Sequence, residues 1–327
     1  MTSPPSSIPI EPDSELNGVT RRKRPVWQTV IGVLVILVAF FFIGRSIWTS
    51  WETVSTYDWR FDFVWLGASA VLVWVSFFFF IWLWRFQLQT LTHRRLRFAS
   101  AFRIWALSNM GKYMPGKVWA VAGMIYLLKR EHFSSSHAIS SSILHQAYSI
   151  TASGLFVIGF LGTEILGSLP WVSLVIGAIV ALIVVYPPFF TRAVNFGLRL
   201  IKREPISITI TPLQAIVVFF TYLLSWIVYG VSLWTMLRGL SPTDVGLWEG
   251  SAIFVAAYLI GFLAVFAPGG LGVREGILTL LLSTHMDASL AGVVAVASRL
   301  WTSVVELLGL IPIGLGVGRP ESHRAER

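Results

Sequence analysis

Two short proline-glycine segments place lysine, arginine and glutamate side chains inside otherwise apolar stretches of the chain. The first is residues 111–119 (GKYMPGKVW) and the second is residues 267–276 (APGGLGVREG). Because a bilayer offers no water to satisfy freed backbone groups, broken helices persist at membrane depth only inside protein or beside a wet cavity. Ionisable side chains at that depth are costly and usually functional. We therefore take these two breaks as the candidate functional site.

The first break matches the beginning of a phosphate-binding loop, in which backbone amides and a lysine cradle phosphates. The match covers residues 111–117 and fails at Val118, where a serine or threonine would ligate Mg²⁺. The preceding residues 102–110 are predicted to form membrane helix rather than the strand that such a loop follows. No nucleotide site is expected here.

The same residues are still suited to bind an anion. Pro115 and Gly116 interrupt the helix, the next helix presents unpaired N–H groups, and Lys112 and Lys117 add positive charge. A lipid phosphate is the natural candidate. In the alternative, both lysines extend to the cytoplasmic membrane interface, beside Tyr113 and Trp119 as aromatic anchors.

The second break combines an unwound segment with two charges. Residues 268–270 (PGG) permit an irregular backbone, and Arg274 and Glu275 then begin the returning helix. Adjacent helical residues do not face each other, so these two side chains need different partners. Glu306 and Arg299 are the expected partners, because they lie two turns apart on one face of the final span, about 10 Å along its axis. The alternative is a purely structural ion-pair network that locks the hairpin.

These two breaks and the final span give the predicted substrate-binding set. No catalytic residue and no cofactor is expected. The set consists of Lys112, Tyr113, Pro115, Gly116, Lys117, Trp119, Pro268, Gly269, Gly270, Arg274, Glu275, Arg299 and Glu306.

The span at residues 138–162 is the most polar one. Besides His145 and Gln146 it carries small hydroxyl residues: Ser140, Ser141, Ser142, Ser149, Thr151 and Ser153. Small hydroxyl residues allow close helix packing, and we favour that interpretation over cavity lining. His145 is interpreted as a hydrogen-bonded packing residue, with proton coupling together with Glu275 and Glu306 as the alternative. No metal site is expected, because no His/Asp/Glu cluster shows ligand spacing.

Composition places these residues in an all-α, polytopic integral membrane protein. Of 327 residues, 55% are hydrophobic and only 13% charged, which exceeds the apolar content of a soluble domain. The predicted spans are 26–44, 64–84, 138–161, 171–190, 212–237 and 288–316. Each approaches or exceeds the roughly 20 residues that cross a bilayer.

The loop charges orient these spans. The segments 21–24, 85–97, 129–130, 192–203 and 319–327 hold 17 of the 25 basic residues, and such loops stay cytoplasmic. Both termini are then cytoplasmic, with residues 1–24 a disordered tail, 25–318 the membrane domain and 319–327 a short tail. The stretch around 192–203 is an expected inner-leaflet contact for anionic lipids, rather than a nucleic-acid surface.

The breaks divide the membrane domain into two similar halves, about 26–161 and 171–316. Each half is predicted to consist of two spans, a broken hairpin and a further span, with the hairpins at about 99–128 and 250–283. Because the first half starts inside and the second outside, the repeat is inverted, as in many secondary transporters with a midplane site. The alternatives are a chance placement of two Pro-Gly pairs, or eight spans if the hairpins cross the membrane.

The two breaks, in this order and separation, resemble the paired signatures of the lysylphosphatidylglycerol synthase transmembrane family, which includes the flippase-like domain of bacterial multipeptide resistance factors. The resemblance covers roughly residues 26–318. It implies a helical, lipid translocase-like fold with a site for an anionic or aminoacylated phospholipid near the broken helices. The synthases of the family carry a soluble aminoacyl-transfer domain after the membrane region. Because this sequence ends at Arg327, synthase activity is not expected.

The sequence thus predicts a lipid translocase of the cell membrane that moves a polar, anionic or lipid-linked headgroup between leaflets and is not an enzyme. Its expected partners are membrane phospholipids and a separate lipid-modifying enzyme, with self-association as a homo-oligomer left open. Two alternatives stand beside it. One is an integral-membrane transferase acting on a lipid-linked substrate, and the other is a non-transporting scaffold for a lipid-modifying enzyme.

Overall fold

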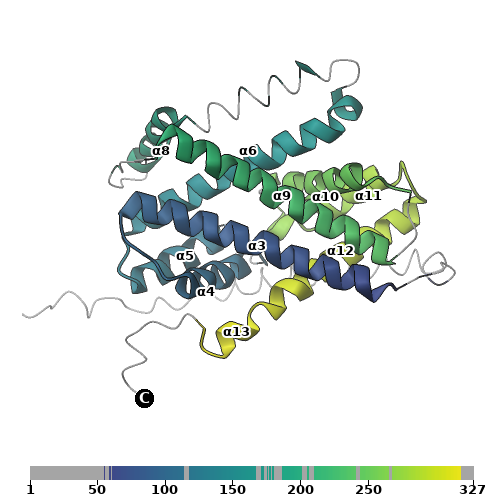
Figure 1. Ribbon diagram of the computed structural model, residues 1–327, viewed down its shortest axis with the longest axis horizontal. Coiled ribbons are helices and arrows are strands. Elements are labelled where there is room, and N and C mark those ends of the chain that lie inside the picture. The colour runs from purple at the N-terminus through teal and green to yellow at the C-terminus, as the bar shows by residue number, and fades with distance from the viewer. Residues whose placement is uncertain are drawn as a thin grey trace, which may run out of the picture.

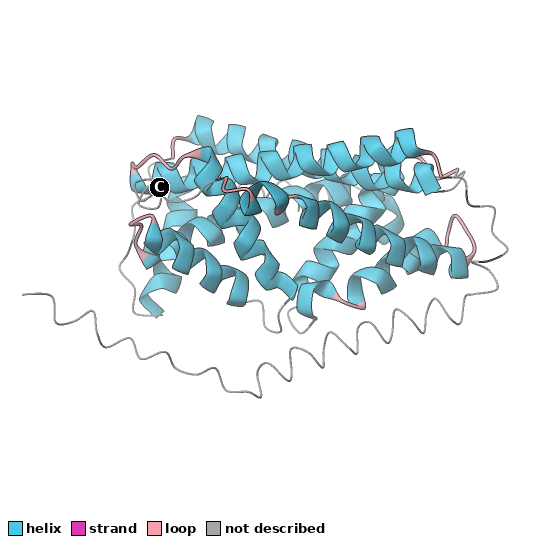
Figure 2. Cartoon of the chain, turned by 90° about the horizontal axis from the view of Figure 1, so that it is seen from below, coloured by secondary structure: helices cyan, strands magenta, loops and turns pink. Residues whose placement is uncertain are grey.

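The computed structural model describes residues 61–113, 118–166, 186–200, 210–240, 244–264 and 267–317, together with a few single positions between 55 and 205. Every regular element in these ranges is a helix (Figure 2), which confirms the all-α prediction. The predicted tails at 1–24 and 319–327 and the span at 26–44 lie outside the described residues.

Among the described residues, four helices are long and apolar enough to cross a membrane. They correspond to four predicted spans, and the last is interrupted at Gly309 before the short helix α13 (Ile311–Gly314). The predicted span at 171–190 is described only in part, and α8 (Pro187–Leu200) begins at its end. The four long helices are α3 (Phe63–Thr92), α6 (Ser135–Leu166), α9 (Pro212–Leu240) and α12 (Ala288–Leu308).

Both Pro-Gly breaks separate short helices. The first hairpin consists of α4 (Phe98–Asn109), the 3₁₀ turn η2 (Met110–Tyr113) and α5 (Val118–Arg130). The second consists of α10 (Leu247–Leu263), the turn η3 (Pro268–Gly270) and α11 (Val273–Leu282). At about 1.5 Å per residue these helices are roughly 15–26 Å long, less than the roughly 30 Å of hydrocarbon. Helices this short favour re-entrant hairpins over the eight-span alternative.

The corresponding spans of the two halves, α3 and α9, pack side by side in opposite directions (Figure 1). The Asp62 amide donates to the Gly239 carbonyl at 2.9 Å, so the start of α3 lies at the end of α9. About two turns further along α3, the Ser69 hydroxyl donates to the Ser232 carbonyl at 2.6 Å. In addition, α6 and α12, the last spans of the two halves, each contact both α3 and α9. This antiparallel arrangement is the one an inverted repeat requires.

The loops gather at two opposite ends, as the charge count predicts. At the basic end, Arg94 Nη1 donates to the His132 carbonyl at 2.6 Å, joining the loops that flank the first hairpin. At the other end His285 Nε2 lies 3.3 Å from Glu249 Oε1, joining the loop after the second hairpin to the first turn of α10 (Leu247–Leu263). In Figure 1, α4 and α5 lie toward one end of α3 while α10 and α11 lie toward the other. The two hairpins thus enter from opposite faces.

Single cysteines test which end faces the cytoplasm, and the cysteine-free sequence suits this experiment. Ser134 and Thr284 are both exposed, at the basic and the opposite end respectively. In intact cells, a membrane-impermeant maleimide should label a cysteine at 284 and leave one at 134 unlabelled until the membrane is opened. Labelling of both positions from the same side would contradict the opposed-hairpin arrangement.

The core lies between α3, α6, α9 and α10. Its largest fully buried side chains include Tyr222 and Phe254. Close approach of the helices depends on small residues: a Cβ at Gly230 would lie 2.8 Å from the Ser251 carbonyl oxygen, so α9 and α10 meet backbone to backbone. This packing fixes the second hairpin against the central spans.

Candidate functional site: a cavity where the two breaks meet

The two breaks contact each other inside the bundle. At Gly269 the backbone has φ +57°, and a Cβ there would lie 3.3 Å from the Lys112 carbonyl oxygen and 3.1 Å from Arg299 Nη2. At Gly270 φ is +72°, and a Cβ would lie only 2.8 Å from the Gly261 carbonyl oxygen. Both the positive φ and the missing Cβ require glycine. These glycines allow η3 to lie against η2 and α10 at once.

Helix α12 binds both breaks through ion pairs. Lys112 Nζ donates to both Glu306 carboxylate oxygens, at 2.7 and 2.5 Å. Arg299 Nη1 donates to Glu275 Oε1 at 2.8 Å, and Arg299 Nη2 donates to the Gly269 carbonyl at 3.1 Å. Glu275 also accepts from its own helix start, where Gly272 N lies 2.7 Å from Oε2. One face of α12 therefore holds the tips of both hairpins.

This arrangement confirms one expected ion pair and corrects another. Glu275 pairs with Arg299, as predicted. The prediction that Glu306 pairs with Arg274 is wrong, because the first hairpin reaches α12 and Lys112 occupies the Glu306 carboxylate. The alternative in which Lys112 extends to the membrane interface is also wrong, since its ammonium points to a buried acid of which 8% is exposed.

Within the described ranges, Arg274 has no carboxylate partner. Its side chain is buried, with 8% exposed, and its guanidinium lies over the Tyr258 ring at 5.4 Å from the centroid. A cation over an aromatic face is stabilised electrostatically, but this contact uses no N–H group. Among the described residues, Nη2 of Arg274 has no hydrogen-bond partner. Such an orphaned buried donor calls for a ligand or water.

A cavity of about 350 Å³ lies at this meeting point. Its walls come from both hairpins and from α3, α6, α9 and α12. Glu275 does not line it and instead holds Arg299 from outside the wall. The predicted site residues on the wall are Lys112, Gly269, Gly270, Arg274, Arg299 and Glu306.

The remaining predicted residues are not brought to this wall. Trp119 is partly buried on α5 and is not among the lining side chains. The side chains of Tyr113 and Pro268, and the whole of Pro115, Gly116 and Lys117, lie outside the described residues. Their predicted roles therefore stay predictions.

The polar face of α6 forms another wall of the cavity, which corrects the packing interpretation. The side chains that line it recur at helical spacing: Ser142, His145, Gln146, Ser149 and Ser153. Ser140 and Ser141, which precede these residues, are buried and do not line it, as expected for packing. His145 is hydrogen-bonded, as predicted, with Nδ1 2.6 Å from the Tyr222 hydroxyl, and it lines the cavity as well.

The sequence of this chain matches a known protein family. Residues 29–309 match the family described as the lysylphosphatidylglycerol synthase TM region. The chain belongs to this family. No curated protein matched the chain significantly. Family membership and the apolar helices together establish a multi-pass membrane protein of the lysylphosphatidylglycerol synthase or flippase type.

In this family member, aromatic residues that sequence reasoning missed complete the cavity: Trp84, Trp105, Trp226, Tyr229 and Tyr258. Tyr258 supports Arg274, and it packs on Trp226 with ring centroids 5.1 Å apart. Nothing distinguishes them in the sequence, because aromatic residues recur throughout the apolar helices. Only the docking of the two halves brings them to one place.

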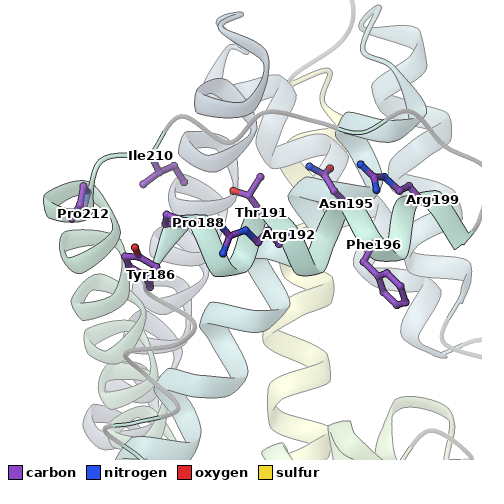
Figure 3. A pocket seen from close by; sticks show the side chains of 9 residues that line it. All are labelled: Tyr186, Pro188, Thr191, Arg192, Asn195, Phe196, Arg199, Ile210 and Pro212. Carbon is purple, nitrogen blue, oxygen red and sulfur yellow. The ribbon is translucent and has the colours of Figure 1, made fainter.

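A second, more open cavity of about 890 Å³ lies along α8. Thr191, Arg192, Asn195 and Arg199 line it, and Phe196 points away from Thr191 and Asn195 (Figure 3). Phe196 and Leu200 are exposed by 67% and 69%. Apolar side chains beside arginines on one helix suit the membrane interface, and the expected inner-leaflet contact stays a prediction.

Proposed function

We propose that this protein moves a phosphate-bearing lipid headgroup between the leaflets through the cavity at the two breaks. The observation that carries the proposal is Arg274, a buried guanidinium on the cavity wall whose Nη2 has no partner among the described residues. An arginine is suited to bind phosphate through paired N–H donors. The lipid tails would stay among the surrounding lipids, because the cavity holds only a headgroup.

The re-entrant hairpins suggest how access alternates. Each hairpin enters from a different end, and each tip is tied to α12 by one ion pair. Breaking the Lys112–Glu306 pair would free the first tip, and breaking the Arg299–Glu275 pair would free the second. Glu275, Arg299 and Glu306 then act as a switchable set. Lys117, outside the described residues, and Lys112 would contact the phosphate together with Arg274.

The ion pairs also favour transport over the transferase alternative. A transferase needs an acid or base near the substrate phosphate, and Glu275 and Glu306 are the sequence's candidates. Both carboxylates accept hydrogen bonds from cationic side chains, so neither is free to act as that acid or base. Movement would be passive, or driven by a proton gradient or the membrane potential.

The test is translocation of an acyl-labelled phosphatidylglycerol in proteoliposomes containing the full chain. We expect Arg274→Gln to lower the initial rate at least about tenfold, because a charge-assisted hydrogen bond to phosphate contributes about 1.5–3 kcal/mol. Arg95→Gln is the matched control, since Arg95 is exposed at the basic end and does not line the cavity. Equal rates for wild type and Arg274→Gln, with both proteins folded, would overturn the proposal.

A further inference from the structure

We infer that the headgroup handled by this cavity joins its phosphate to a neutral, hydroxyl-rich unit, a polyol or sugar, rather than to a cationic aminoacyl group. This inference rests on the proposed function and names its substrate class. It departs from the aminoacylated lipid that the family resemblance suggests.

The charges on the cavity wall disfavour a cationic headgroup. Lys112, Arg274 and Arg299 line the cavity, and Glu306 is the one carboxylate among the described lining residues. Each Glu306 oxygen already accepts a hydrogen bond from Lys112. A lysyl group would therefore bring further ammonium charge to a wall that is already cationic, without a free acid to receive it. A phosphate carrying a neutral unit meets no such repulsion.

The α6 wall supplies groups that match hydroxyls. Gln146 presents an amide that both donates and accepts hydrogen bonds. The Ser142 hydroxyl donates to the Ala138 carbonyl at 2.8 Å and can still accept, and the Ser149 hydroxyl accepts from Trp226 Nε1 at 3.1 Å and can still donate. His145 adds a ring nitrogen. Its Nδ1 lies 2.6 Å from the Tyr222 hydroxyl, which leaves Nε2 for a ligand. A ligand hydroxyl can both donate and accept, so it can pair with Nε2 in either neutral tautomer.

Two further orphaned polar atoms belong to residues of the same wall. Within the described ranges, Trp84 Nε1 and Ser108 Oγ have no hydrogen-bond partner, like Arg274 Nη2. All three can donate, and native proteins leave few buried polar groups unpaired. Donors from α3, α4 and α11 around one cavity indicate a ligand with several oxygen atoms.

The aromatic residues suit a ring with apolar C–H faces. Trp226 and Tyr258 pack together beside Arg274, and Trp105 lies on the wall as well. Ligand pockets typically combine such apolar surfaces with a few convergent polar groups. A volume of 350 Å³ lies near the lower end of the roughly 300–1,000 Å³ of small-molecule sites, which fits one headgroup. Inositol or glycerol phospholipids and isoprenoid phosphosugars share this chemistry.

The experiment compares acyl- or isoprenyl-labelled lipids in proteoliposomes of the full chain. The probes are phosphatidylinositol, phosphatidylglycerol, a short isoprenoid phosphomannose, phosphatidic acid and lysyl-phosphatidylglycerol. We expect at least one of the first three lipids to move about tenfold faster than the lysyl lipid. Leaving a buried polar group without its hydrogen-bond partner changes a free energy by an amount that corresponds to about this factor. The first three probes distinguish the sources of the hydroxyl-rich unit, and phosphatidic acid reports the phosphate alone.

A pair of α6 variants assigns the selectivity to the cavity wall. Gln146→Leu should slow the preferred hydroxyl-rich lipid about five- to tenfold and leave phosphatidic acid unchanged, since only hydroxyl contacts are lost. Ser141→Ala is the control, because Ser141 is buried beside the cavity residues and its hydroxyl donates to the Ala138 carbonyl of its own helix. It should leave every rate unchanged.

Binding in detergent gives a readout that does not depend on transport. Inositol 1-phosphate should raise the unfolding midpoint of wild type more than equimolar inorganic phosphate, and Gln146→Leu should abolish that difference. Arg274-dependent movement in which the lysyl lipid equals or exceeds the hydroxyl-rich lipids would overturn this inference and leave the translocase proposal intact. Movement of no lipid would overturn the translocase proposal. Equal effects of the two soluble phosphates would overturn the inference whether or not lipids move.

Discussion

Replacing Glu306 with glutamine is expected to destabilise the protein by about 3 kcal/mol, because it leaves the Lys112 ammonium without its counter-charge inside the bundle. The Glu306 side chain is 8% exposed and that of Lys112 is 24% exposed. Removing one partner of a buried ion pair is far more costly than removing the pair, since the remaining charge keeps its desolvation penalty. The measurement is the unfolding midpoint in one detergent. Glu249→Gln is the control, because Glu249 and His285 form a more exposed pair that contributes little.

The double variant Lys112→Met, Glu306→Leu separates stability from function. Apolar side chains of similar volume often replace a buried ion pair at little cost, so the midpoint should return to near the wild-type value. If the pair is a switch, translocation in proteoliposomes should still be lost. Wild-type translocation by this stable double variant would instead identify the pair as a structural lock, the alternative that the sequence left open. A double variant as unstable as Glu306→Gln would contradict the ion-pair account itself.

Features that depend on local sequence could be predicted. Four spans follow from apolar length, and α3 starts at Phe63 where Asp62 Oδ1 accepts from the Val64 amide at 2.9 Å. The hairpins follow from glycine and proline in the middle of apolar stretches. The pairing of Glu275 with Arg299 could also be anticipated, because α11 and α12 are joined by a short loop and must pack together.

Features that depend on how the two halves dock could not be predicted from the sequence. Lys112 and Glu306 are 194 positions apart, and no local pattern specifies that the first hairpin reaches α12. Once it does, Glu306 is occupied, and Arg274 must rest on Tyr258 instead. The same docking converts the serines of α6 from an expected packing surface into a cavity wall. Hydropathy gives the spans, but side-chain partners across a bundle depend on the relative rotation and depth of its helices.

Substitutions of Arg299 should separate its two contacts in the second break. Arg299→Gln removes the counter-charge of Glu275, whose side chain is 13% exposed, and should cost about 3–5 kcal/mol. Arg299→Lys keeps a cation near Glu275 but cannot also reach the Gly269 carbonyl, because lysine lacks the planar fork of donors. The loss of one hydrogen bond should cost only about 1 kcal/mol. Unfolding midpoints in the same detergent measure both effects.

Hydrogen exchange shows where the lysine variant acts. The hydrogen bond from Arg299 Nη2 to the Gly269 carbonyl fixes a residue whose φ is +57°. Glycine adopts other backbone conformations with similar ease, so Gly269 should become more mobile when this bond is lost. Arg299→Lys should therefore speed amide exchange in residues 267–276 and leave residues 98–109 of the first hairpin unchanged. Faster exchange in both hairpins would mean that Arg299 stabilises the bundle as a whole. Unchanged exchange in both would mean that the Gly269 contact does not hold the second break, and that the positive φ values of Gly269 and Gly270 are maintained by the packing of η3 against α10 alone.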